Sequence, residues 1–193
     1  NFNGIARFNY SITDNNGGTV SNTVELNIVA INDAPELSGL QSVLPGGSED
    51  NLYTITANQL LAGYEDVDGE TLSIADGQLA LTDPNQGIIE GNPNDGWTFT
   101  PAADFNGTIE FSYTITDGNG AELPATNSFA LASVNDIPEL TGVKATLAKG
   151  TEDLTYNISA ADLLAGYTDA DIANDAGSTQ ALSILGLSAT DGV

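Results

Sequence analysis

The chain has 193 residues, 40% of them hydrophobic, so it is long enough and apolar enough to build a folded core. Its 27 acidic residues face three basic ones, a formal net charge of −24, which excludes nucleic acid as a partner because phosphate binding needs a basic patch. Neither Cys nor His is present, which excludes disulfides, thiol and imidazole chemistry and zinc sites built on these residues, and no run of about 18 apolar residues could insert into a membrane as a helix.

The excess of carboxylates allows two interpretations. The charges are either dispersed over a solubilising or halophilic surface, or gathered in clusters that recruit cations. Salt bridges cannot neutralise them, since Arg7, Lys144 and Lys149 are the three basic residues of the chain. The positions of the carboxylates along the sequence therefore become the informative feature.

The sequence repeats itself with the same offset in three separate places. Residues 2–14 match 105–117, residues 32–37 match 135–140, and residues 60–64 match 163–167. One shared offset in three places indicates tandem units. It predicts three parts, namely the C-terminal part of a preceding repeat at 1–33, a complete repeat at 34–136, and the N-terminal part of the following repeat at 137–193.

Within the complete repeat, the pattern predicts one helical turn followed by short strands. Residues 56–62 form the turn, capped by Thr56. Alternating apolar positions predict strands at 97–100, 109–115 and 129–131. A unit of about 100 residues with short strands and frequent turns predicts an all-β fold, a β-sandwich of immunoglobulin-like type, with Trp97 in its core.

Acidic and amide side chains gather at the boundaries between these elements. The clusters are Asn32-Asp33, Glu49-Asp50, Asp66-Val67-Asp68-Gly69-Glu70, Asp104-Phe105-Asn106 and Asp117-Gly118-Asn119. Hard divalent cations take about six to eight oxygen ligands, mostly from loops. In an extended loop, alternate side chains point to the same side, so Asp66 and Asp68 can hold one ion. A single cluster of this kind is more often plain turn chemistry, but recurrence at the repeat spacing favours cation sites.

The order of these motifs resembles the cadherin-like repeats that occur in tandem in large bacterial surface adhesins, including the repeats-in-toxin adhesins. The resemblance is carried by residues 32–35, 49–50, 60–62, 66–70, 104–107 and 113–120, and it extends over the complete repeat and both partial ones. It implies tandem immunoglobulin-like or cadherin-like β-sandwich repeats of about 103 residues, with Ca2+ bound at the junctions between consecutive units.

By this resemblance, each junction draws its ligands from two units and the linker between them. The set implied at the first junction is Asn32, Asp33, Asp66, Asp68 and Asp117. The set implied at the second junction is Glu49, Asp104, Asn135, Asp136, Asp169 and Asp171. The linkers depart from the family pattern, since Ala30 and Ser133 stand where an acidic residue is usual. We therefore expect fewer or weaker ions at each junction.

The resemblance implies a calcium-rigidified extender module of a secreted or cell-surface bacterial adhesin. An alternative is a homophilic or carbohydrate-binding adhesion module, for which exposed tyrosines such as Tyr53, Tyr64 and Tyr167 would be candidates. Another is an extracellular filament in which the partial repeats at 1–33 and 137–193 of neighbouring molecules complete one domain. We do not expect an enzyme, because catalytic residues seldom recur once per repeat, whereas structural metal ligands do.

The expected partners follow from these hypotheses. They are neighbouring repeats of the same or an identical chain, together with a cell-surface or glycan ligand. We expect no nucleic acid and no membrane insertion of this segment. The expected location is extracellular, at the bacterial cell surface.

Overall fold

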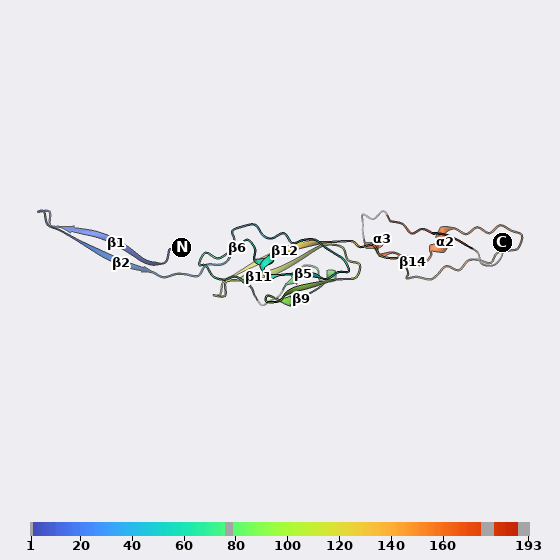
Figure 1. The fold of residues 1–193 in the computed structure, drawn as a ribbon, viewed down its shortest axis with the longest axis horizontal. Helices are drawn as coiled ribbons and strands as arrows, with labels where there is room; N and C mark the ends of the chain where they lie inside the picture. Colours follow the sequence, from blue (N-terminus) through green and yellow to red (C-terminus); the bar gives the residue numbers. More distant parts are fainter. Residues whose placement is uncertain (1, 76–78, 175–179, 189–193) are drawn as a thin grey trace.

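The computed structural model of the chain describes residues 2–75, 79–174 and 180–188. Figure 1 shows a narrow, elongated molecule in which an N-terminal hairpin, a central body and a C-terminal segment follow one another along the long axis. The hairpin consists of β1 (Gly4–Thr13) and β2 (Thr19–Ile28). The C-terminal segment, residues 137–188, contains β13 (Glu139–Leu140), α2 (Ala160–Leu164), β14 (Tyr167–Thr168) and α3 (Ala170–Asn174). No helix in the described ranges is long and apolar enough to cross a membrane.

The central body is a sandwich of two β-sheets. One sheet has the strand order β5-β10-β9 and the other has the order β4-β12-β11-β7, with β8 also paired to β11. The elements of the body are β3 (Glu36–Leu37), β4 (Gly47–Ser48), β5 (Tyr53–Ile55), α1 (Ala57–Leu61), β6 (Tyr64–Glu65), β7 (Ser73–Ile74), β8 (Ala80–Leu81), η2 (Pro84–Gln86), β9 (Gly87–Asn92), β10 (Gly96–Pro101), β11 (Gly107–Thr116) and β12 (Glu122–Ala132). The prediction of an all-β sandwich is thereby confirmed, and so are the three predicted strands.

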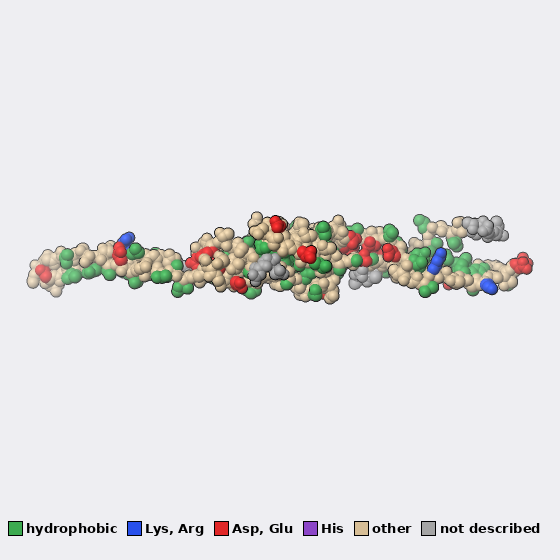
Figure 2. Space-filling model, turned by 90° about the horizontal axis from the view of Figure 1, so that it is seen from below, with side chains coloured by type: hydrophobic (Ala, Val, Ile, Leu, Met, Phe, Trp, Pro, Cys, Tyr) green, Lys and Arg blue, Asp and Glu red, His purple; other side chains and the backbone are tan. Residues whose placement is uncertain are grey.

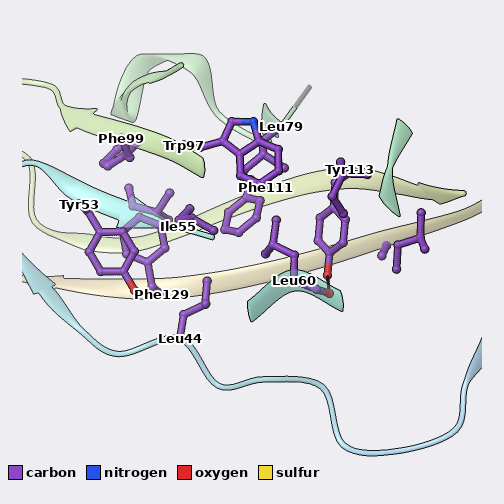
Figure 3. Packing of buried hydrophobic residues seen from close by; sticks show 14 of the residues in the cluster. Leu44, Tyr53, Ile55, Leu60, Leu79, Trp97, Phe99, Phe111, Tyr113 and Phe129 are labelled. Atoms are coloured by element: carbon purple, nitrogen blue, oxygen red, sulfur yellow. Dashed lines mark hydrogen bonds between the residues drawn. The ribbon is translucent and has the colours of Figure 1, made fainter. Parts of the chain in front are cut away.

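The core lies between the two sheets and is built largely from aromatic rings. Phe99 of β10 and Phe111 of β11 are fully buried, and Trp97 is buried beside them, as the sequence predicts. The ring of Tyr53 stacks on that of Phe129 with centroids 3.9 Å apart, and Phe99 meets Phe129 edge-on (Figure 3). Such ring pairs add to the free energy already gained by burying their area.

Helix α1 closes one side of the sandwich and is fixed at both ends. Thr56 caps it in a capping box with Gln59, which satisfies backbone groups at its start. Tyr113 is buried and its hydroxyl donates a hydrogen bond to the Leu60 carbonyl at 3.1 Å, and burial raises the Tyr113 pKa to about 12. The chain leaves the helix through Gly63 at φ +86°, where a Cβ would stand 2.4 Å from the Leu40 carbonyl oxygen. Glycine is required there.

The repeat seen in the sequence is also a repeat of backbone pairing. β1 pairs with β2 in the same register as β11 with β12, shifted by the repeat offset, so that Phe8 faces Val24 as Phe111 faces Asn127. At the other end, β13 pairs with β14 as β3 pairs with β6. Similar sequence therefore gives the same local structure in both flanking segments, even though they differ from the central body in what covers them.

One set of expected surface residues is corrected by the fold. Tyr53 is buried, with its ring on Phe129 and its hydroxyl donating to the Pro45 carbonyl, so it cannot serve as an exposed aromatic ligand contact. Tyr64 is half-buried and accepts a hydrogen bond from Gln41. Tyr167 remains exposed. The three-residue strand β5 is too short for its sequence to reveal which of its side chains faces the core.

The repeat supplies a matched pair of substitutions for testing the core. Phe111 is 0% exposed, whereas its counterpart Phe8 in the hairpin is 55% exposed. We expect Phe111→Ala to lower the free energy of unfolding of the central body by about 3–5 kcal/mol, and Phe8→Ala to change it little. Denaturant unfolding followed by Trp97 fluorescence measures both. A loss from Phe8→Ala equal to that from Phe111→Ala would contradict the assigned core.

Candidate metal centre

Acidic side chains gather where the central body meets the flanking segments on each side (Figure 2). We call the group between the hairpin and the body the near cluster; its members are Asn32, Asp33, Asp66, Asp68, Glu70 and Asp117. We call the group between the body and the C-terminal segment the far cluster; its members are Glu49, Asp50, Asp104, Asn106, Asn135, Asp136, Asp169 and Asp171. Each residue of the two implied sets thus lies at the end of the body to which it was assigned, and its role as a ligand stays a prediction.

The near cluster joins the linker to the central body through hydrogen bonds. The backbone N–H of Asp33 donates to Asp68 Oδ2 at 2.8 Å, and the side-chain amide of Asn32 donates to Asp117 Oδ2. The N–H of Asp68 donates in turn to Asp66 Oδ1 at 2.9 Å, within the turn that includes Gly69. Carboxylates of the body therefore hold the linker backbone in place.

Three carboxylates of the near cluster face one another. Oxygen atoms of Asp66, Asp68 and Glu70 lie within 4.8 Å of one another. Asp66 Oδ2 and Glu70 Oε2 are buried and have no hydrogen-bond partner. Burying an unpartnered carboxylate oxygen is unfavourable unless a cation coordinates it. The residues therefore fit a hard divalent cation on both donor type and donor placement.

Glu70 belongs to this group although the implied ligand set omits it. The signal in the sequence is the alternation of Asp66, Asp68 and Glu70, which an extended loop turns to one side. Its other oxygen, Oε1, accepts a hydrogen bond from the Asn119 amide at 2.9 Å. This contact ties the loop of Glu70 to the turn after β11.

Asp117 lies in the near cluster with its oxygens already engaged. Its Oδ1 accepts from the backbone N–H groups of Asn119, Gly120 and Ala121 at 2.7 to 3.1 Å, and its Oδ2 accepts from Asn32. The Asn32 amide, followed by these backbone donors, holds the pKa of Asp117 below its usual value against the opposing effect of burial. In this arrangement the ionised Asp117 organises the β11–β12 turn and the linker.

The far cluster contains the most deeply buried carboxylate of the two groups. Glu49 is 1% exposed. Its Oε1 accepts from the backbone N–H of Val134 at 2.6 Å and its Oε2 accepts from the Asn106 amide at 3.3 Å. Oxygen atoms of Glu49, Asp136 and Asp171 lie within 4.8 Å of one another. A side chain of the body thus reaches the linker and the following segment at a single point.

The linker of the far cluster repeats the contacts of the near one. The N–H of Asp136 donates to Asp171 Oδ2 at 2.8 Å, and the N–H of Asp171 donates to Asp169 Oδ1 at 3.1 Å. The amide of Asn135 donates to the Asp136 carbonyl at 2.8 Å, as Asn32 does to Asp33. The same linker geometry therefore occurs on both sides of the central body.

Electrostatic repulsion is strongest around Asp136. Its Oδ2 is buried without a hydrogen-bond partner. Burial raises the Asp136 pKa, and the neighbouring carboxylates of Asp104, Asp50, Asp171 and Glu49 raise it further. The nearest candidates for neutralising these charges are few, since the sequence has three basic residues and one of them, Arg7, already pairs with Glu25 on the hairpin at 2.7 Å. A cation bound between these carboxylates would attract each of them and offset their mutual repulsion.

These contacts predict opposite effects of one substitution with and without cation. We expect Asp136→Asn to raise the thermal stability of the chain in chelator, because it removes one of the repelling charges. The same change should weaken calcium binding roughly tenfold or more, because it removes a carboxylate oxygen from the cluster. Thermal unfolding and titration calorimetry measure the two effects.

The matched control for this substitution is Glu110→Gln, which makes the same charge change on an exposed position of β11. It should leave both quantities nearly unchanged. Equal effects of the two substitutions would show that net charge, and not the far cluster, controls stability and binding.

Comparison with known proteins identifies the fold family. A family model for the cadherin-like domain matches residues 31–132. Solved structures that resemble the chain are endo-fucoidan hydrolase MfFcnA4 from glycoside hydrolase family 107 (17% identity, TM-score 0.34, 66% of this chain covered), a single-residue variant of it (16%, 0.35, 69%) and endo-fucoidan hydrolase MfFcnA9 (16%, 0.30, 67%). The chain spans 19% to 22% of the length of these structures. At such scores the likeness carries no inference about activity.

No curated protein matches the chain. The family match lies over the central body and the linker before it, where both sheets of the sandwich and the carboxylates of the near cluster are found. It confirms the resemblance to cadherin-like repeats, while the bacterial adhesin context stays a prediction. Since the matched residues make up more than half of the sequence, the chain belongs to the cadherin-like domain family.

Proposed function

We propose that the chain is a structural extender of an extracellular adhesin, in which Ca2+ bound at the near and far clusters stiffens the linkers between β-sandwich units. The observation that carries this proposal is the recurrence of one linker arrangement on both sides of the body. Asp33 binds Asp68 through its N–H as Asp136 binds Asp171. A hydrogen bond between linker and unit that recurs once per repeat is what a role in joining consecutive units requires.

The donor chemistry supports calcium as the ion. Neither Cys nor His is present in the sequence, and both clusters offer oxygen atoms alone, which Ca2+ prefers at high coordination number. The residues that would hold it are Asp66, Asp68 and Glu70 at the near cluster and Glu49, Asp136 and Asp171 at the far cluster. Asp104 and Asp169 line the same hollow as Asp136 and complete the far set.

Calcium would act on the linkers through the free energy of its binding. At the far cluster the ion would be held by side chains of the body, the linker and the following segment. At the near cluster it would be held by body side chains, of which Asp68 also accepts the linker N–H of Asp33. Binding would therefore order both linkers. Extracellular modules of this kind have dissociation constants of about 10⁻⁴–10⁻³ M. Ala30 and Ser133 contribute no carboxylate to the linkers, which favours the weak end of this range.

The remaining parts of the proposal concern the setting of the molecule. Millimolar calcium is found outside cells, so weak sites of this type favour an extracellular location, which we place at a bacterial surface. The acidic residues lie on loops that recur with the repeat and also hold the linkers, which favours a structural role over catalysis. The burial of Tyr53 removes one of the aromatic contacts on which a glycan-binding role would depend.

Solution scattering of the 193-residue chain tests this function. We expect the maximum dimension to be large and sharply defined in millimolar calcium. In chelator it should become smaller and broadly distributed, because without the ion the carboxylates of each cluster repel one another and no longer fix the linker to the body. The double substitution Asp68→Asn and Asp171→Asn should reproduce the chelator result in the presence of calcium.

The control for this experiment is Glu90→Gln with Glu110→Gln, which removes two exposed charges from β9 and β11, away from both clusters. This variant should respond to calcium as the unsubstituted chain does. A maximum dimension that does not change between calcium and chelator would refute the extender function.

A further inference from the structure

The first part of the central body runs beside its last strand and in the same direction. β4 pairs with β12 in parallel, with Gly47 opposite Leu131 and Ser48 opposite Ala132. Directly after this pair, the N–H of Glu49 donates to the carbonyl of Ala132 at 3.0 Å. The segment that enters the unit and the strand that leaves it are therefore joined to each other directly.

Upstream of β4 this contact continues through side chains instead of a backbone ladder. Pro45 has no N–H to donate, so a ladder cannot run through it. The Gln41 amide donates to the Thr126 carbonyl at 2.6 Å, and the Asn127 amide donates back to the Ser42 carbonyl at 3.2 Å. Each amide thus supplies a hydrogen bond between the two segments where β4 does not reach.

These contacts share one register. The side-chain contacts of Gln41, Asn127 and Glu49 each join residues that are 85 positions apart in the sequence. A constant separation of this kind arises when two segments run parallel along their whole contact. We call residues 41–49, residues 126–134 and the hydrogen bonds between them the clamp.

Both halves of the clamp are anchored in the core. Leu44 lies between the amide contacts and β4 and is buried, and Phe129 and Leu131 hold β12 against the same core (Figure 3). Gln41 is half-buried and also donates to the Tyr113 hydroxyl at 3.1 Å. The core therefore holds the two segments in place, and partial burial limits the access of water that would compete for their donors.

The places where the chain enters and leaves the body decide how tension acts on the clamp. The linker before the body meets it at the near cluster, and the linker after it leaves at the far cluster, at the opposite end (Figure 1). A pull on the two linkers therefore draws residues 41–49 toward the near cluster and residues 126–134 toward the far cluster. Because the two segments are parallel, this pull slides them past each other and loads the hydrogen bonds of the clamp together.

We propose that the clamp is the force-bearing element of the unit, and that Gln41 and Asn127 carry its load upstream of β4. The proposal rests on the extender function, since an array under tension loads each unit through its linkers. Glu49 continues the clamp into the linker, because its N–H closes the clamp and its carboxylate accepts the N–H of Val134. Resistance to force is governed by the rate of unfolding, which such a clamp lowers in the loaded direction.

Unfolding of the full chain under constant force tests the clamp, with the rate of unfolding as the readout. The sequence contains no Cys, so a pair of introduced cysteines gives unique attachment points for the pulling handles. Ala34→Cys with Ile137→Cys applies force in the sliding direction. Ala34→Cys with Glu122→Cys pulls both segments from the near end and separates them one bond at a time. All three positions are exposed, and at equal force we expect unfolding to be at least about tenfold slower in the sliding direction.

Two substitutions test the side-chain contacts of the clamp. Gln41→Ala and Asn127→Ala should each raise the rate of unfolding in the sliding direction about fivefold, because each removes a hydrogen bond that carries load. The matched control is Asn92→Ala in the other sheet. Asn92 is also half-buried, and its side chain accepts from the backbone N–H groups of Asn94 and Asp95. This variant should leave the rate in the sliding direction nearly unchanged, even where denaturant shows an equal loss of stability.

Equal rates in the two pulling directions would overturn the inference, and so would an equal effect of Asn92→Ala in the sliding direction. The comparison of directions stays decisive if Gln41→Ala or Asn127→Ala fails to fold, because it needs neither substitution. Both directions are measured in calcium and in chelator. A clamp that fails here leaves the scattering result intact, and a maximum dimension that ignores calcium leaves the difference between directions intact, so the two proposals fail separately.

Discussion

Repulsion among carboxylates at the linkers is the constraint on which the rest of the structure depends. Asp136 shows it most clearly, since its neighbours are carboxylates and its Oδ2 is buried without a donor. Like charges held this close oppose the geometry that brings them together. A divalent cation turns the same set into an attractive centre. The proposed cations would therefore stabilise the straight arrangement of hairpin, body and C-terminal segment.

The sandwich connects the two clusters through one pair of strands. Asp117 stands in the turn that joins β11 to β12, at the near end of the body. At the far end, the N–H of Glu49 donates to the carbonyl of Ala132, the last residue of β12, at 3.0 Å. A continuous hydrogen-bonded ladder thus runs from one cluster to the other, so a pull on one linker would pass along β11 and β12 to the next.

The sequence predicted the parts of the site that depend on periodicity. The repeat offset relates Asp33 to Asp136 and Asp68 to Asp171, and the structure repeats their contact at the same distance of 2.8 Å. The sequence did not predict the hydrogen bonds that Asp117 accepts, nor the one that the Asn106 amide donates to Glu49, because both depend on how a turn folds back. The burial of Tyr53 was missed for a related reason, since β5 is three residues long and its face is set by Phe129, far away in the sequence.

The two flanking segments show that local structure and stability have different origins in this chain. The hairpin pairs in the same register as β11 and β12, yet Phe8 is exposed where Phe111 is buried. Stability in tandem arrays comes from contacts between neighbours as well as from each unit. Backbone pairing in this chain is therefore set locally, whereas burial is set by the rest of each unit.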